Sequence, residues 1–262
     1  MAHNEGVTET PFSYVVMKSK NAVVMVDVGF DRIKYGKVLG DNTGVENWHS
    51  PAELLPEIGI KPEEVTHVIL THLHFDHAGN TQSFPKANFY LQRKELEDWM
   101  WMYTQPPEFG FFRTPIDPDD LIRVNDLLAS KRLRLLDGDS ENLLPGIDVY
   151  AAFDTHTYGS LWVSVLGANR TKYVMAGDNV NVYENLHGLN NDGIMIPAGY
   201  MAGSATNAIK AAFAMMNEVD KDWKRVIPVH EARLPNFYPS RKSKYGTWIT
   251  EICLANSETS KI

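Results

Sequence analysis

The motif His72-Leu-His-Phe-Asp-His77 constrains the fold of this chain more than any other stretch. It follows directly on the apolar, β-branched run 65–70, which predicts a buried strand. Side chains two residues apart on an extended chain lie on the same side, so His72 and His74 can chelate one metal ion. Asp76 and His77 continue into a turn and can reach a second metal beside the first. Imidazole and carboxylate are ligands that suit zinc and related divalent ions.

Three more candidate ligands each follow another apolar run in the same way. They are His156 after residues 147–152, Asp178 after 173–176 and His230 after 225–229. Loops at strand ends are where sheet proteins assemble their sites. A chance cluster of surface histidines would not share this placement. We therefore predict that these side chains converge with the motif on a metal site.

Apolar runs predict two groups of strands separated by helices. We predict strands over residues 12–17, 22–28, 65–70, 87–91, 147–152, 161–166, 173–176 and 225–229, and helices over 93–103, 118–128 and 206–219. The polar turn at 18–21 makes the first two strands a hairpin. Strands, then helices, then strands and helices again indicate two sheets with helices outside them.

The 262 residues contain no Ser/Gly/Pro-rich linker and no long charge run, which predicts a single domain over residues 1–262. The net charge of −8 disfavours nucleic acid as a partner, because nucleic-acid binders usually carry a clustered basic face. The single cysteine, Cys253, excludes a disulfide within the chain. The N-terminus lacks a secretory signal pattern and no apolar run approaches the ~20 residues of a membrane span. We therefore expect a cytoplasmic protein that does not bind membranes.

Residues 71–79 resemble the metal-binding signature of the metallo-β-lactamase superfamily. Four weaker motifs occur in the family's order and extend the resemblance over nearly the whole chain: Val26-Asp-Val-Gly29, Asp154-Thr-His-Thr157, Ala176-Gly-Asp178 and Pro228-Val-His-Glu231. The resemblance implies an α/β fold, an αββα sandwich of two mixed β-sheets flanked by helices, with the metals at one edge. It also implies that Asp27 supports the metal loop from behind the ligands.

The resemblance further implies two divalent metal ions per chain. His72, His74 and His156 would hold one metal, Asp76, His77 and His230 would hold the second, and Asp178 would bridge them. Flavin-linked diiron relatives carry a glutamate where this chain has His74, which favours hydrolytic zinc chemistry over oxygen reduction. Zinc (Zn2+) is therefore the expected metal, with Mn2+, Fe2+ and Co2+ as alternatives.

Within this family the nearest resemblance is to the N-acyl-homoserine lactonase-like branch. The implied reaction opens a cyclic ester (lactone) or a cyclic amide by attack of a metal-bridging hydroxide on the carbonyl, with Asp76 orienting the hydroxide. Lactonases of this branch usually place a tyrosine three residues after the bridging aspartate Asp178. This chain has Asn181 there and Tyr183 two residues later. Either residue is a candidate donor to the substrate, or the substrate differs from that of the branch.

Residues 99–112 are rich in aromatic side chains and methionine, and they belong to a predicted helical insertion at about 93–130. One interpretation is a lid over an apolar pocket, which would suit a small-molecule substrate with an apolar or aromatic part. The other is core packing or a homodimer interface, where the same residue types are enriched. The sequence leaves both interpretations open.

Several rival functions use the same scaffold or the same motif. A mononuclear-iron persulfide dioxygenase would use only part of the ligand set. Thioesterases and phosphodiesterases are further alternatives, although the acidic charge disfavours a phosphodiester substrate. A non-catalytic binding module is disfavoured because the ligand set is complete. The chain contains no Gly-x-Ser-x-Gly elbow, which argues against a serine hydrolase.

Overall fold

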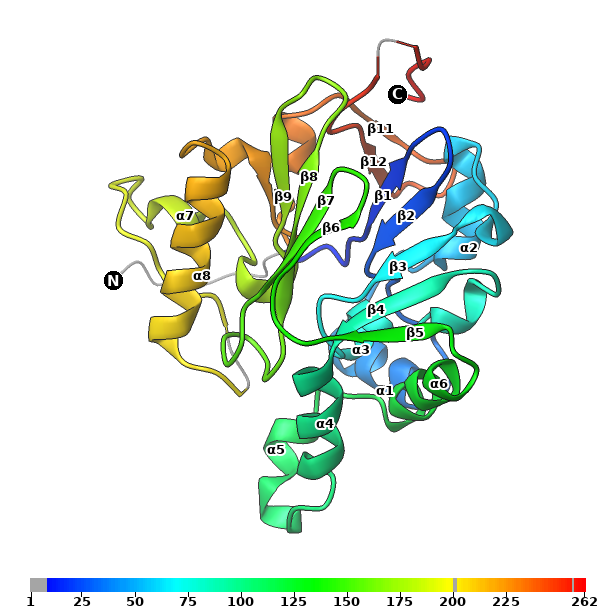
Figure 1. Ribbon diagram of the computed structural model, residues 1–262, viewed down its shortest axis with the longest axis vertical. Coiled ribbons are helices and arrows are strands. Elements are labelled where there is room, and N and C mark those ends of the chain that lie inside the picture. The colour runs from blue at the N-terminus through cyan, green and yellow to red at the C-terminus, as the bar shows by residue number, and fades with distance from the viewer. Residues whose placement is uncertain (1–8, 200–201, 256) are drawn as a thin grey trace.

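Two five-stranded sheets form the centre of the computed structural model, which describes residues 9–199, 202–255 and 257–262 (Figure 1). The order in the first sheet is β1 (Val15–Lys18), β2 (Val23–Val26), β3 (His67–Ile69), β4 (Asn88–Gln92) and β5 (Leu133–Leu136). The order in the second is β10 (Val226–Ile227), β9 (Lys172–Met175), β8 (Leu161–Leu166), β7 (Ile147–Ala151) and β6 (Ser140–Leu144). Strands β11 (Ser240–Lys242) and β12 (Trp248–Thr250) form a separate antiparallel pair.

Both sheets are mixed. Strand β1 is antiparallel to β2, whereas β2, β3, β4 and β5 pair in parallel. Strands β6 to β9 are antiparallel to their neighbours, and β10 joins β9 in parallel. The carboxyl ends of β2 and β3 therefore open at one edge of the first sheet, where the histidine motif begins.

Helices lie on the outer side of each sheet (Figure 1). Their bounds are α1 Lys34–Asn42, α2 Pro51–Leu54, α3 Phe75–Ala78, α4 Arg93–Met102, α5 Gly110–Arg113, α6 Pro118–Ala129, α7 Glu184–His187 and α8 Ala205–Glu218. Short 3-10 turns are η1 Leu55–Ile58, η2 Pro62–Glu64, η3 Thr81–Ser83, η4 Pro107–Phe109, η5 Gly177–Asn179, η6 Trp223–Arg225 and η7 Leu234–Asn236. Within the described part of the chain, no helix has both the length and the apolar character that crossing a bilayer requires.

Successive side chains on the strands of the first sheet pack alternately into two separate hydrophobic cores, one on each face of the sheet. On β2, Val24 and Val26 pack with residues of the second sheet, while Met25 between them packs on the other face with α4 and α6. Tyr90 and Phe89 on β4 divide in the same way. This period of two is what a strand buried on both faces requires. The predicted sandwich of two mixed sheets flanked by helices is confirmed.

The structure corrects several predicted boundaries and adds elements that were missed. The predicted strand 225–229 is only the two residues of β10, and the predicted strand 12–17 pairs only from Val15 onward. Helix α1 was missed because it contains Gly36 and Gly40, which lower helix propensity. Gly36 is required there, since a Cβ atom would lie 2.4 Å from the carbonyl oxygen of Asp31. Strands β5 and β6 were missed because their sequences, Leu-Arg-Leu-Leu and Ser-Glu-Asn-Leu-Leu, lack β-branched residues.

Helix α6 carries a buried acid whose removal should stabilise the protein. Burial raises the pKa of Asp120 to about 7, although Arg123 binds one of its oxygens. A carboxyl whose folded pKa is raised lowers stability as pH rises from its unfolded value of 3.8 to about 7. We expect Asp120→Asn to match the wild type near pH 4 and to be more stable at pH 8, by at most about 4 kcal/mol. Urea unfolding at both pH values checks this, and equal stability at pH 8 would contradict it.

Candidate metal centre

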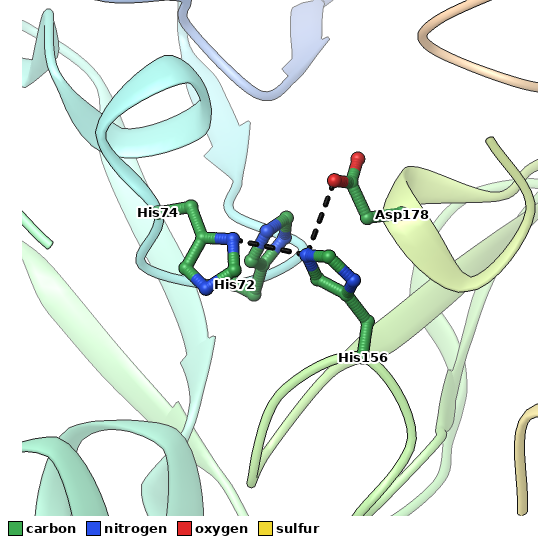
Figure 2. A group of neighbouring side chains, drawn as sticks. All are labelled: His72, His74, His156 and Asp178. Atoms are coloured by element: carbon green, nitrogen blue, oxygen red, sulfur yellow. Dashed lines mark hydrogen bonds and ion pairs between the residues drawn. The ribbon is translucent and has the colours of Figure 1, made fainter. Parts of the chain in front are cut away.

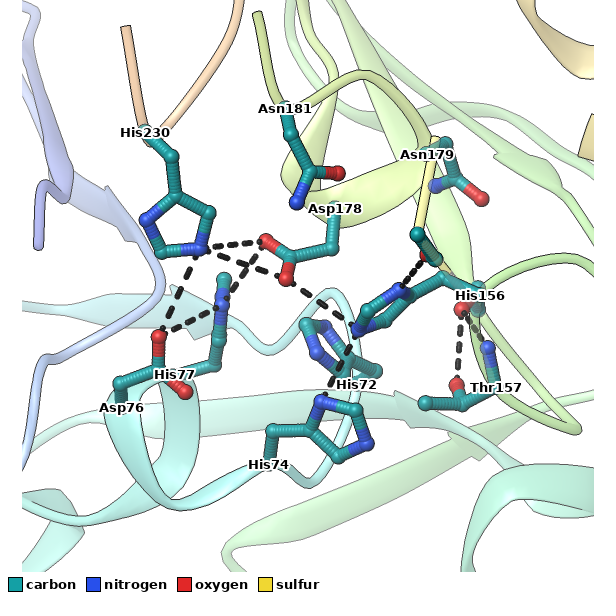
Figure 3. A network of polar contacts seen from close by, with 12 residues as sticks. His72, His74, Asp76, His77, His156, Thr157, Asp178, Asn179, Asn181 and His230 are labelled. Carbon is teal, nitrogen blue, oxygen red and sulfur yellow. Dashed lines mark hydrogen bonds and ion pairs between the residues drawn. The ribbon is translucent and has the colours of Figure 1, made fainter. Parts of the chain in front are cut away.

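The seven predicted ligands are all buried and lie in loops at strand ends. The histidine motif follows β3 and enters the short helix α3, His156 follows β7, Asp178 lies in η5 after β9, and His230 follows β10. Their ligand atoms form two groups, and within each group all atoms lie within 4.8 Å of one another. The first group is His72, His74, His156 and Asp178 (Figure 2), and the second is Asp76, His77 and His230 (Figure 3).

Asp178 stands between the two groups. Its Oδ2 atom lies 3.2 Å from Nε2 of His156. Its Oδ1 atom lies 3.0 Å from Nε2 of His77 and 3.2 Å from Nε2 of His230. Oδ1 therefore faces the second group, while Oδ2 faces His156 of the first group and also lies 3.3 Å from Nε2 of His230, as Figure 3 shows. This is the placement that a bridging ligand needs.

The donor atoms fit divalent metal ions better than they fit one another. Nε2 of His72, Nε2 of His77 and Oδ1 of Asp178 are buried without a hydrogen-bond partner among the described residues. The contact between His77 and Asp178 is thus short enough for an ion pair but does not form a hydrogen bond. Ligands bound at about 2.0–2.1 Å around a tetrahedral zinc lie about 3.3–3.4 Å apart. The separation of 3.4 Å between Nε2 of His77 and Oδ2 of Asp76 matches that spacing, whereas Nδ1 of His74 and Nε2 of His156 lie closer, at 2.9 Å.

The surroundings set the charge of these groups. Burial lowers the pKa of His72 and of His74 well below the usual value, which keeps both imidazoles neutral as metal binding requires. Burial raises the pKa of the Asp178 carboxyl, but the neighbouring histidines lower it by more, so it falls well below its usual range. Burial lowers the pKa of His230, but the neighbouring Asp178 carboxylate raises it by more, so the pKa is about 9. Asp178 is therefore an anion on which cationic partners converge.

Asp27 orients two of the ligands from behind. Its carboxylate accepts hydrogen bonds from Nδ1 of His77 at 2.8 Å and from the hydroxyl of Thr71 at 2.9 Å. Nδ1 of His72 lies 3.0 Å from that same hydroxyl. With Nδ1 carrying the proton, both rings turn an unprotonated Nε2 toward the site. The predicted support from Asp27 is confirmed, and its φ of 60° is a left-handed conformation that aspartate tolerates.

Replacing Asp27 with asparagine should weaken metal binding without unfolding the chain. An amide nitrogen would face the Nδ1 hydrogen of His77, so this ring would lose its fixed orientation. We expect the affinity for the metal held by His77 to fall about 10–100-fold. Calorimetric binding of zinc to metal-free protein measures this, with exposed Asp41→Asn as control. Wild-type affinity in the Asp27 variant would show that the hydrogen bond does not position His77.

Two further buried side chains, which the sequence analysis missed, join neighbouring ligand loops. Asn179 accepts a hydrogen bond from the hydroxyl of Thr155 at 2.6 Å and so ties the His156 loop to the Asp178 loop. Glu231 accepts one from the backbone of Tyr183 at 3.0 Å and so ties the His230 loop to the start of α7. Both residues directly follow a ligand in sequence, and adjacency is the only signal that could have identified them.

The two candidate substrate donors have different surroundings. Asn181 lies beside Asp178 and extends toward the ligands (Figure 3), and its Oδ1 is buried without a partner among the described residues. Tyr183 is buried, with its ring 4.6 Å from Trp223 and 5.4 Å from Phe237 between centroids. Its hydroxyl also lacks a partner in the described part of the chain. The structure thus places Tyr183 in the core and brings only Asn181 to the metal ligands.

Aromatic rings border the ligands on two sides. Phe12 lies edge-on to His230 at 5.7 Å, and Nδ1 of His230 donates to the carbonyl of Pro11 at 2.8 Å. The residues before β1 therefore run along the second group instead of pairing as a strand. On the other side, Trp99 lies 6.0 Å from His74 between ring centroids. The site thus combines polar ligands with apolar walls.

The aromatic segment 99–112 divides into core and surface. Trp99 and Met102 are buried in the core that covers the first sheet, as the core interpretation predicts. Trp101 and Phe111 are 56% and 68% exposed on the projecting end of α4 and α5 (Figure 1). The lid and the homodimer interface remain predictions for these two side chains. Size-exclusion chromatography with light scattering on Phe111→Ser tests the second.

Comparisons with known proteins agree with this geometry. The family described as the metallo-beta-lactamase superfamily matches residues 8–212. An N-acyl homoserine lactonase of Bacillus cereus is 29% identical over 91 residues, which are 31% of this chain and 36% of that enzyme. The matched stretch spans about a third of the length of this curated relative.

Two solved structures share the fold. One is a Bacillus thuringiensis AiiA variant with N-decanoyl-L-homoserine at its active site, with a TM-score of 0.62 and 18% identity over 87% of this chain and 84% of that one. The other is AidC, a dizinc quorum-quenching lactonase, with a TM-score of 0.59 and 17% identity over 91% of this chain and 79% of that one. At these identities the likeness concerns the fold.

Proposed function

Since this chain belongs to the metallo-β-lactamase superfamily, we propose that it is a hydrolase that uses two divalent metal ions to open a cyclic ester or a cyclic amide. The observation that carries the proposal is the position of Asp178 between two buried ligand groups, with its carboxylate in contact with His156 of the first and with His77 and His230 of the second. The sequence match to lactonases favours a lactone over the amide. Phe12, half-buried beside His230, favours a substrate with an apolar or aromatic part.

Zinc is the metal we propose for both positions, since the ligands are imidazoles and carboxylates whose ligand atoms lie within 4.8 Å of one another in each group. Manganese, iron and cobalt are the alternatives. When bound, a pair of such ions makes water acidic enough to act as a nucleophile near neutral pH and polarises a carbonyl. No Ser-His-Asp arrangement is then needed.

Asp76 is the group we propose to move the proton. Its Oδ2 lies 3.4 Å from His77 and 3.6 Å from His230, while Oδ1 makes no hydrogen bond or ion pair with the described residues. Burial raises the pKa of this carboxyl, but His77 and His230 lower it by more, so it is ionised at neutral pH. Oδ1 can therefore accept a proton from the attacking water and return it to the leaving oxygen.

Asn181 is the group we propose to hold the substrate carbonyl or ring oxygen through Nδ2. Replacing it with alanine should raise KM about 3–10-fold, the value of one hydrogen bond of about 0.5–1.5 kcal/mol, and leave metal content unchanged. Tyr183→Phe is the matched control, because it removes a core hydroxyl and should leave KM unaltered. Steady-state kinetics on a lactone compares the two. A raised KM in the tyrosine variant alone would assign the role to Tyr183 instead.

The proposal is tested by metal analysis combined with a substrate panel. The protein is purified with its native metal and assayed on lactones, cyclic amides, thioesters and phosphodiesters. About two zinc ions per chain together with lactone or cyclic amide opening would support the proposal. One iron per chain together with oxygen consumption on a persulfide would instead identify a mononuclear-iron dioxygenase. Turnover of thioesters alone, or of phosphodiesters alone, would identify the protein as a thioesterase or a phosphodiesterase instead.

A further inference from the structure

Glu95, in the first turn of α4, is a buried acid that the proposed reaction does not use. It is 0% exposed, and neither group of ligand atoms includes it. Its Oε1 accepts hydrogen bonds from the backbone of Leu73 at 2.9 Å and from the indole of Trp99 at 2.7 Å. Its Oε2 accepts from the hydroxyl of Thr157 at 2.8 Å and from the backbone of Gly159 at 2.6 Å. Both oxygens are therefore fully used by donors.

Three of these four donors belong to the loops that carry the first metal group, and the fourth, Trp99, lies on α4 itself. Leu73 lies between His72 and His74, and Thr157 directly follows His156. The histidine motif follows β3 of the first sheet, and the His156 loop follows β7 of the second. The single carboxylate of Glu95 thus holds these two loops at a fixed distance. The distance it fixes includes the 2.9 Å between Nδ1 of His74 and Nε2 of His156.

The contact is also sterically defined. A Cβ atom at Gly159 would lie 2.2 Å from the backbone nitrogen of Glu95, so only glycine lets the His156 loop come this close to α4. Burying a carboxylate costs free energy unless its oxygens are hydrogen-bonded, and here its donors come from both loops. A neutral apolar residue at position 95 would satisfy none of them. The arrangement therefore depends on a carboxylate at this position.

We infer that Glu95 is a positioning residue that sets the separation of the two loops and so controls the affinity and geometry of the metal held by His72, His74 and His156. The inference rests on the metal centre of the proposed function. It does not depend on the substrate, since Glu95 contacts neither the second ligand group nor Asn181 among the described hydrogen bonds. The effect of Glu95 should therefore be confined to one of the two metals.

The test compares Glu95→Gln with the wild type in metal binding and in spectroscopy. Glutamine has the same shape, but its NH2 group would face two of the donors from which the Glu95 carboxylate accepts hydrogen bonds. Zinc binding to metal-free protein should show one site weakened about 10–100-fold, while the second site keeps its affinity. The visible absorption bands of the cobalt-loaded variant should also change, because they report the geometry around the metal.

Two controls separate positioning from a general loss of stability. Glu97→Gln changes an exposed acid on the same helix, where Glu97 pairs with Arg93. Val124→Ala removes core volume from α6 and lowers stability by packing alone. Both should keep the wild-type affinities and the wild-type cobalt spectrum. If Glu95→Gln does not fold, Thr157→Val removes one donor to Oε2 and should give a smaller change in the same direction.

Wild-type affinity at both sites and an unchanged cobalt spectrum in Glu95→Gln would overturn the inference and leave the proposed function intact. Equal weakening of both sites, matched by Val124→Ala, would also overturn it, because the effect would then be one of stability. A wild type that binds no metal would instead overturn the proposed function and the inference with it.

Discussion

Replacing Asp178 with alanine is expected to lower kcat/KM by more than about 10³-fold and to release metal from both positions. Loss of a single stabilising group in an active site already costs about 10²–10³-fold. Asp178 contributes to both ligand groups at once, with Oδ2 toward His156 and Oδ1 toward His77 and His230. Elemental analysis of the purified variant and lactone hydrolysis measure the two effects.

The control for this prediction is Asp137→Ala, which removes an exposed acid paired with Arg93. It should keep full metal content and activity. Asp178→Asn is the more conservative variant, since it retains one oxygen and the side-chain shape. We expect it to keep at most one tightly bound metal. Two metals and wild-type turnover in the alanine variant would show that Asp178 does not bridge.

Removing the metals is expected to lower the melting temperature by on the order of 10 °C for each ion lost. At free metal of about 1,000 times Kd, one bound ion adds about 4 kcal/mol to stability. For a chain of this size each kcal/mol shifts the melting temperature by about 2–4 °C. The physical reason is that Nε2 of His72 and Nε2 of His77 are buried and lack hydrogen-bond partners in the described part of the protein. Melting with a chelator, then with zinc restored, measures the shift.

The comparison variant for this second prediction is His72→Ala. Because it lacks one ligand of the first group, chelation should shift its melting temperature less than that of the wild type. A chelator that leaves the wild-type melting temperature unchanged would contradict the prediction. The same result would argue that the buried donors are satisfied by contacts within the chain.

The ligands could be predicted from the sequence because they stand after apolar strands and because the motifs that contain them resemble those of a known family. The residues that hold the loops together could not. Glu95 is one acid among several on an amphipathic helix, and its role depends on Leu73 and Thr157, which approach it only in the folded chain. Such tertiary hydrogen bonds leave no local trace in a single sequence.

The choice between Asn181 and Tyr183 shows a second limit. Both follow the strand-end aspartate within a few residues, and which one faces the ligands depends on the path of the chain after η5. The structure turns Tyr183 into the aromatic cluster with Trp223 and Phe237. The sequence offers no spacing rule for such a turn. Helix α1 was missed for a different reason, since its close packing against Asp31 requires glycine at position 36, and a propensity rule counts glycine against a helix.

Neither sheet alone supplies a complete set of ligands. His72, His74, Asp76 and His77 follow β3 of the first sheet, whereas His156, Asp178 and His230 follow strands of the second. A folding intermediate with only one sheet formed would therefore offer incomplete chelation. Metal uptake during refolding would then report the packing of the first sheet against the second. Bound ions would also slow the separation of the two sheets during unfolding. Stopped-flow refolding with a zinc-sensitive dye can place this step in time.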